Sequence, residues 1–200
     1  MRAGSTMLEA DGPLGDGTAQ LRADFVDMTA GTFSTDSEGG YTPLWATCPT
    51  AVCHGETHQD SMGVSLAAGW FNRTWQADIG STPIGMKVVT IAGGGSYRGR
   101  MGPLGFILNV HHRPLTNSLL SFGGQRDPNT GKIWGGVRAT GATWNLSYDT
   151  GGRHGVWASP GIDLLTGENV ENNWRVRWMA GYYYKIINQP NRRVTIGLNN

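Results

Sequence analysis

Two cysteines and two histidines lie in one short polar segment and are the first candidates for metal or redox chemistry. Cys48 and Cys53 occur in TCPTAVCHGETH, which also contains His54 and His58. Zinc prefers thiolate and imidazole ligands, but a C-x4-C pair followed directly by histidine matches no common finger or ribbon spacing. We therefore expect no metal here. A disulfide between Cys48 and Cys53, closing a short loop in an oxidising compartment, is the favoured interpretation, with free thiols as the alternative.

Carboxylates, paired histidines and glycine runs could also carry chemistry. A glycoside hydrolase needs two carboxylates about 5–10 Å apart. His111 and His112 are adjacent, so on a strand their imidazoles point to opposite faces and do not converge. The glycine run 93–95 lacks the GK[ST] ending of a phosphate loop. The acidic candidates mostly fall in predicted turns or loops, where solvated carboxylates are the default: Asp78, Asp127, Asp149, Asp163, Glu168 and Glu171. We expect no enzyme activity and no cofactor.

The composition narrows the class of protein. The 200 residues suit one domain, and a net charge of +1 gives no reason to expect a nucleic-acid partner. The 31 glycines and 8 tryptophans suit many turns and aromatic-rich strands better than helices. No run approaches the roughly 20 apolar residues of a membrane-spanning helix, whereas strands of a membrane barrel need only about 9–11 alternating residues. The N-terminus lacks the apolar core of a secretory signal, so a membrane location requires upstream sequence.

The stretch 173–187, NWRVRWMAGYYYKII, shows how the strands are built. Taking every second residue separates an apolar or aromatic face from a face with all three cations, as a strand of period two requires. The apolar set is Trp174, Val176, Trp178, Ala180, Tyr182, Tyr184 and Ile186. The other set is Arg175, Arg177, Met179, Gly181, Tyr183 and Lys185.

The same alternation recurs along the chain. It is clear in residues 18–28, 61–70, 75–79, 104–111, 142–148 and 193–199. A less regular strand is expected at 87–97, with a bulge or a close backbone approach at its glycines, and SLLSFGGQ (118–125) is expected to continue the strand pattern. About nine or ten strands without helical crossovers predict an all-β antiparallel meander. Alternation alone does not separate a soluble sandwich from a transmembrane β-barrel, but aromatics near strand ends favour the barrel.

Three segments carry a specific resemblance. WQADIGSTPIG (75–85), HHRPLTNSLLSFGGQRDPNTGKIWGGVRATG (111–141) and NWRVRWMAGYYYKIINQPNRRVTIGLNN (173–200) resemble the C-terminal domain of the cellulose synthase operon protein C family. The resemblance covers nearly the whole chain. It implies a bacterial outer-membrane β-barrel through which cellulose leaves the cell, in contact with outer-membrane lipid and the cellulose synthase export complex. It also implies a preceding periplasmic scaffold of helical repeats.

Two departures from the family pattern shape the domain prediction. No helical repeat of about 34 residues is visible in residues 1–200, and the chain ends inside a predicted strand without a terminal aromatic residue. We therefore expect residues 1–200 to form a partial domain, roughly the N-terminal half of the barrel. An incomplete barrel leaves unpaired strand edges, so we do not expect transport by the isolated chain.

The strand faces also assign the candidate site. A neutral glucan chain needs hydrogen-bonding groups and aromatic faces along a lumen. The expected lumen-facing, substrate-binding residues are Arg175, Arg177, Tyr183, Lys185, Thr143 and Asn145, and the expected lipid-facing residues are Trp174, Trp178 and Tyr184. The alternative function is a soluble carbohydrate-binding β-sandwich, in which an exposed aromatic row would stack on sugar.

Overall fold

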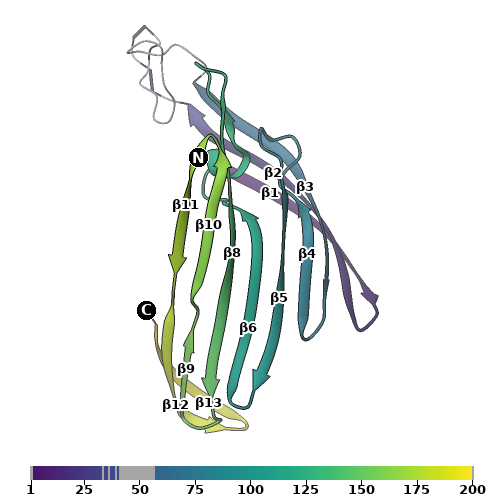
Figure 1. Cartoon of the computed structure of the whole chain (residues 1–200), viewed down its shortest axis with the longest axis vertical. Helices are drawn as coiled ribbons and strands as arrows, with labels where there is room; N and C mark the ends of the chain where they lie inside the picture. Colours follow the sequence, from purple (N-terminus) through teal and green to yellow (C-terminus); the bar gives the residue numbers. More distant parts are fainter. Residues whose placement is uncertain (1, 33, 36, 39, 41–56, 200) are drawn as a thin grey trace.

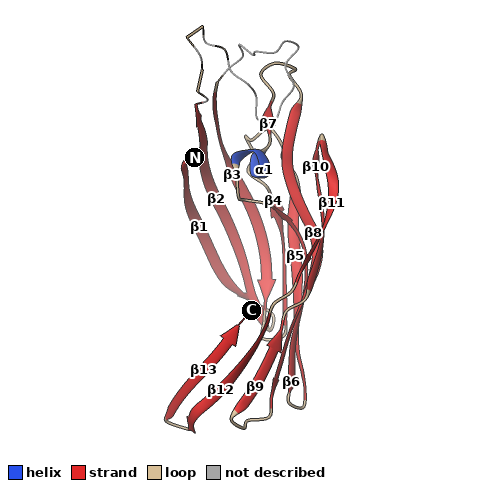
Figure 2. Cartoon of the chain, turned by 90° about the vertical axis from the view of Figure 1, so that its left-hand side faces the viewer, coloured by secondary structure: helices blue, strands red, loops and turns tan. Residues whose placement is uncertain are grey.

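The computed structural model describes residues 2–32, 34–35, 37–38, 40 and 57–199. They form one strongly curved antiparallel sheet with a short helix against its concave face (Figures 1 and 2). The strands are β1 (Arg2–Leu14), β2 (Gly17–Thr32), β3 (His58–Phe71), β4 (Trp75–Ser81), β5 (Ile91–Met101), β6 (Leu104–Pro114), β7 (Gln125–Arg126), β8 (Ile133–Asp149), β9 (His154–Ala158), β10 (Gly161–Glu168), β11 (Val170–Arg177), β12 (Ala180–Gln189) and β13 (Arg192–Asn199). The all-β prediction is confirmed.

The topology is the predicted meander. From β1 to β6 each strand pairs with the next, and β8 follows β6 in the sheet. Strands β9 and β10 follow one another along β8; β11 pairs with β10, and β12 pairs with β9. In the described part of the chain β1 pairs only with β2 and β13 only with β12, so the sheet is not closed.

The connections differ between the two ends of the sheet. Two-residue turns at Gly15–Asp16, Gly102–Pro103 and Pro190–Asn191 lie at one end, called here the short-turn end. In the turn between β3 and β4, Asn72 Oδ1 accepts hydrogen bonds from the backbone N–H groups of Thr74 and Trp75. Longer connections, including 82–90 and 115–132, lie at the opposite, long-loop end, and these two fold inward instead of standing away from the sheet.

The helix α1 (Leu119–Gly123) lies within the curve of the sheet (Figure 2). Ser118 caps it, because its hydroxyl accepts a hydrogen bond from the N–H of Ser121. Leu119 packs with Met28 of β2 and Met86 of the inward connection, which gives a small apolar cluster on the concave face. The prediction that SLLSFGGQ forms a strand is wrong, since one turn of helix buries its leucine here.

Four further differences concern strand boundaries. Strand β1 precedes the first strand expected from the sequence, and β10 fills a region where none was expected. The predicted strand at 87–97 begins only at Ile91, and β5 pairs with both neighbours without a bulge. The close backbone approach expected as the alternative is present, since a Cβ on Gly93 would lie 2.6 Å from the backbone oxygen of Asp78. The stretch 173–187 is divided between β11 and β12, with a break at Trp178 and Met179. Backbone hydrogen bonds between Ser159 and Met179 continue the sheet across that break.

Candidate functional site: the polar concave face

The two faces of the sheet differ in chemistry, as the alternation predicts. The convex face carries exposed apolar side chains, such as Leu21 at 63% exposed and Ile79 at 62% exposed, which lie on either side of Ala68. The concave face, which α1 covers at the long-loop end, carries polar and charged residues together with many glycines. A cleft of about 490 Å³ on the concave face is lined in part by Gln20, Arg22, Asp24, Gln76, Asp78 and Arg113.

One row of directly paired residues crosses the concave face. It runs from β2 to β11 through Gln20, Gly69, Asp78, Gly94, His111, Gly141, Asp163 and Arg175. Glycine alternates with a polar residue over most of this row. A Cβ on Gly141 would lie 2.6 Å from Asp163 Oδ1, so glycine makes room for the carboxylate to lie against the wall.

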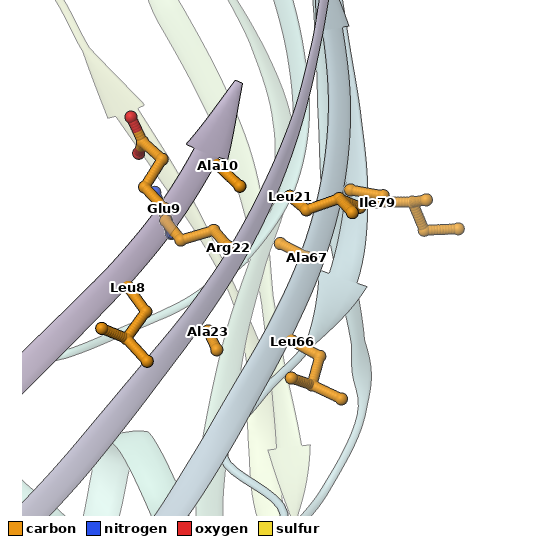
Figure 3. A pocket seen from close by; sticks show the side chains of 10 residues that line it. Leu8, Glu9, Ala10, Leu21, Arg22, Ala23, Leu66, Ala67 and Ile79 are labelled. Carbon is orange, nitrogen blue, oxygen red and sulfur yellow. The ribbon is translucent and has the colours of Figure 1, made fainter. Parts of the chain in front are cut away.

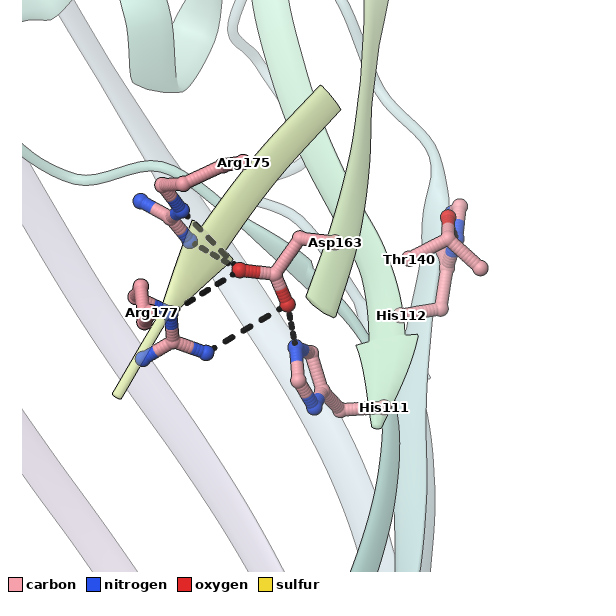
Figure 4. A network of polar contacts seen from close by, with 6 residues as sticks. All are labelled: His111, His112, Thr140, Asp163, Arg175 and Arg177. Atoms are coloured by element: carbon pink, nitrogen blue, oxygen red, sulfur yellow. Dashed lines mark hydrogen bonds and ion pairs between the residues drawn. The ribbon is translucent and has the colours of Figure 1, made fainter. Parts of the chain in front are cut away.

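Asp163 is the centre of the largest ion-pair cluster (Figure 4). Its side chain is 0% exposed, and Oδ2 accepts hydrogen bonds from Nε of Arg175 at 2.9 Å and Nε of Arg177 at 3.0 Å. His111 Nε2 lies 2.9 Å from Oδ1. A buried carboxylate requires such partners, since an unpaired charge away from water is costly. His112 points away and contacts Thr140, as predicted from strand geometry (Figure 4).

A second cluster lies at the short-turn end around Asp149. Lys185 Nζ lies 2.7 Å from Oδ2 and 3.0 Å from Oδ1 of this carboxylate, and the Tyr183 hydroxyl donates to Oδ2 at 2.6 Å. Asp78 makes a third pair, because both terminal nitrogens of Arg113 donate to its oxygens at 2.5 and 2.6 Å. Acids on other strands therefore hold these cations in place: β10 pairs directly with β11, whereas Asp78 and Arg113 are separated by β5, and Asp149 and Lys185 by β9.

The six predicted lumen residues share this face. Arg175 and Arg177 bind Asp163, and Tyr183 and Lys185 bind Asp149. Asn145 Oδ1 accepts from the Ser159 hydroxyl at 2.6 Å, and Thr143 lies opposite Gly161. Their predicted contact with a substrate stays a prediction. Cys48 and Cys53, together with the predicted disulfide, lie outside the described residues.

The three predicted lipid-facing residues lie at different levels of exposure. Trp174 is 64% exposed on the convex side of β11, and Trp178 is 66% exposed at the break after it. Tyr184 is half-buried, since its ring lies 5.1 Å from that of His154 and its hydroxyl accepts from Arg153.

The convex face has no covering layer in the described part of the chain. A shallow hollow of about 550 Å³ on it is lined by Leu8, Leu21, Leu66 and Ile79 between the smaller alanines (Figure 3). A β-sandwich buries its apolar face under a second sheet, and no second sheet lies here among the described residues. The fold therefore does not match the sandwich alternative.

Most of the acids expected in turns or loops lie on strands. Asp78, Asp149 and Asp163 are strand residues with cationic partners, and Glu168 and Glu171 also lie on strands. Only Asp127 of these six acids lies in a turn. Asp163 is one of the acids expected in turns or loops, whereas the structure places it within β10. The signal for it was a single acid between Ile162 and Leu164, which alternate with it at period two.

No group of three or more His, Cys, Asp or Glu side chains suited to a metal ion is found among the residues that the structure describes. Over the same residues, no helix is both long and apolar enough to span a membrane.

Comparison with known proteins identifies the family. The family model described as the C-terminus of cellulose synthase operon protein C matches residues 1–200. The chain belongs to this family. A cellulose synthase operon protein C from Escherichia coli K12 is 55% identical over 202 residues, and one from Salmonella typhimurium LT2 is equally similar. These matches cover 100% of this chain and 18% and 17% of the relatives, so the chain spans less than a fifth of their length.

A more distant member of the cellulose synthase operon protein C family matches nearly the same length of the chain at lower identity. The protein from Pseudomonas fluorescens SBW25 is 32% identical over 201 residues, which covers 96% of this chain and 15% of that protein. The family name associates the domain with cellulose biosynthesis.

Proposed function

We propose that this domain forms part of the wall of a pore in the bacterial outer membrane through which cellulose is exported. The observation that carries the proposal is the two-faced sheet, whose convex face exposes large apolar side chains while its concave face holds the ion pairs. A sheet in water would bury the apolar side, whereas a membrane pore presents it to lipid and keeps polar groups inside.

The aromatic residues of the convex face support a membrane location. Trp75 and Tyr97 lie with ring centroids 4.5 Å apart, and Phe106 lies 5.9 Å from Tyr97. Exposed Tyr148 and Tyr182 continue this group across β8 and β12 near the short-turn end. Aromatic side chains gather at the level of the lipid headgroups in membrane proteins, so this group suits one edge of the apolar band.

The concave face suits passage of a neutral glucan rather than its hydrolysis. Sugar hydroxyls need donors and acceptors along the path, and these are supplied by the paired side chains. Asp78, Asp149 and Asp163 are each held by cations, whereas a glycosidase acts through a pair of carboxylates about 5–10 Å apart. We infer that the domain has no chemistry of its own. Its partners are then the cellulose chain, outer-membrane lipid and other proteins of the cellulose synthase operon.

Tryptophan quenching in lipid vesicles tests the membrane assignment. The full-length protein is reconstituted with brominated lipids, and its fluorescence is compared with that in unlabelled vesicles and with aqueous acrylamide. We expect strong quenching by the lipid, because Trp75, Trp144, Trp174 and Trp178 are exposed on or beside the convex face. Quenching by acrylamide without quenching by lipid would reject the pore.

Cell-surface cellulose provides the test of transport. In the full-length protein, replacing Arg175 and Arg177 together by glutamate places like charges against Asp163 and alters the polar path. We expect less surface cellulose per molecule of protein inserted in the outer membrane. Unchanged export by normally inserted protein would contradict a role of this face in transport.

A further inference from the structure

Two aromatic rings lie flat on the concave wall at the short-turn end. Trp157 of β9 is directly opposite Gly181 of β12, and Tyr183 of β12 is directly opposite Gly155 of β9. A Cβ built on Gly181 would lie 2.5 Å from Trp157 Cε2, and one built on Gly155 would lie 2.5 Å from Tyr183 Cε2. Real Cβ atoms do not approach so closely, so each ring covers the place where its glycine partner lacks a side chain.

The arrangement repeats diagonally across the two strands. Trp157 and Tyr183 occupy diagonal positions of an antiparallel pair, where Cα atoms are about 7–8 Å apart. Each ring has one face against the wall, and both side chains remain half-buried, so the uncovered area faces the interior. The indole N–H of Trp157 has no hydrogen-bond partner among the described residues.

Polar groups flank the second ring. The Tyr183 hydroxyl donates to Asp149 at 2.6 Å, and Lys185 Nζ lies over the Tyr183 ring, 5.6 Å from its centre. Two flat apolar surfaces therefore lie beside the Asp149 carboxylate, which is held in place by the buried amine of Lys185. A β-linked glucan is a ribbon whose sugar faces carry C–H groups and whose edges carry hydroxyls, so its two surfaces match this combination. Aromatic rings supply a large rigid contact area for such a face.

We propose that Trp157 and Tyr183 form a stacking platform for the sugar rings of a β-glucan, with Asp149, whose side chain is 33% exposed, contacting the hydroxyl edges. This inference rests on the proposed export function and assigns it a binding subsite. A platform of two rings orients the ribbon against the wall. Because each ring can release a sugar face by sliding, the chain is held loosely enough to move on.

Current recordings of the full-length protein in planar bilayers test the platform, with cellohexaose as the probe. We expect Trp157→Ala to shorten the blockade about tenfold, as loss of one buried aromatic contact implies. The matched control is Trp144→Ala, because Trp144 is 55% exposed on the convex face. Cellohexaose should block this variant for as long as it blocks the wild type. Gly181→Ala retains the indole but moves it off the wall, so it should also shorten the blockade.

The outcomes separate the platform from the proposed function. Open-channel conductance shows that each variant has folded and inserted. If wild-type channels conduct ions but cellohexaose never blocks them, glucan passage is wrong and the platform is wrong with it. If cellohexaose blocks wild type, Trp157→Ala and Trp144→Ala equally, the platform alone is wrong. A shorter blockade in Trp157→Ala and Gly181→Ala, with Trp144→Ala unchanged, supports it.

Discussion

Arg177 and Asp163 lie on adjacent strands and are joined by two hydrogen bonds. Nε and Nη2 of Arg177 donate to Oδ2 and Oδ1 of Asp163 at 3.0 and 3.3 Å. The acid is fully buried, while the Arg177 side chain is 47% exposed and that of Arg175 is 37% exposed. The buried carboxylate therefore needs the arginines to compensate its charge, whereas the arginines can be solvated without the carboxylate.

This inequality predicts which substitutions destabilise the fold more. Replacing both Arg175 and Arg177 by methionine leaves a buried carboxylate with only His111 beside it, which should cost about 3–5 kcal/mol. Asp163→Asn leaves two cations that can reach water, so we expect a smaller loss of about 1–3 kcal/mol. Urea unfolding of the full-length protein in vesicles measures both.

The pair Arg22 and Asp24 provides the control for that comparison. Their side chains are 44% and 23% exposed, so Arg22→Met should change the free energy of unfolding by at most about 1 kcal/mol. A larger loss from Asp163→Asn than from the double arginine substitution would contradict the assigned burial.

Adjacent residues of β6 test the assignment of the two faces. Val110 is 52% exposed on the convex face, and Asn109 beside it belongs to the concave face. Val110→Arg should lower the free energy of unfolding in vesicles by about 2–4 kcal/mol, because it places a charge against lipid. Asn109→Arg should be much milder, since its charge faces the polar interior. Equal losses in the two variants would show that the faces are wrongly assigned.

Leu119 anchors α1 to the concave face. It is 1% exposed and packs with Met28 and Met86, so Leu119→Ala should weaken this cluster by about 2–5 kcal/mol. We expect faster amide hydrogen exchange in α1 and larger ionic conductance, because the helix lies within the curve of the sheet. Asn117→Ala, at an exposed position before the helix, is the matched control. Unchanged exchange in α1 would disprove the anchoring role.

Asp127 predicts a pH dependence in the turn before β8. Burial alone would raise the pKa of Asp127, but hydrogen bonds from Thr130 and Asn129 outweigh it and lower the pKa below its ordinary value. The stabilisation is complete above the ordinary aspartate pKa of about 3.9 and is lost as pH falls through the lower pKa of the folded turn. Hydrogen exchange in residues 125–132 should therefore accelerate under acid conditions, and Asp127→Asn should remove that dependence.

The sequence by itself determined the class of the fold and the two faces of its strands. Alternation along a strand is a local property, so Arg22 and Leu21 could be assigned to opposite faces without knowing any partner strand. The divergence of His111 and His112 followed from the same geometry. The hairpin turns were readable because glycine, proline and asparagine favour them. The family resemblance relied on longer strings of residues and is confirmed by the match over residues 1–200.

Only the tertiary structure decided which side chains meet. Asp163 binds Arg175, which is 12 residues away, and His111, which is 52 residues away, through the register of strands that the sequence does not specify. A short apolar run such as SLLSF suits either a strand or one turn of helix, and burial against Met28 and Met86 selected the helix. Likewise, the rings of Trp157 and Tyr183 can lie against the wall because the residues opposite them on the paired strand are glycines. Such contacts depend on pairing across the sheet, whereas the faces depend only on the chain itself.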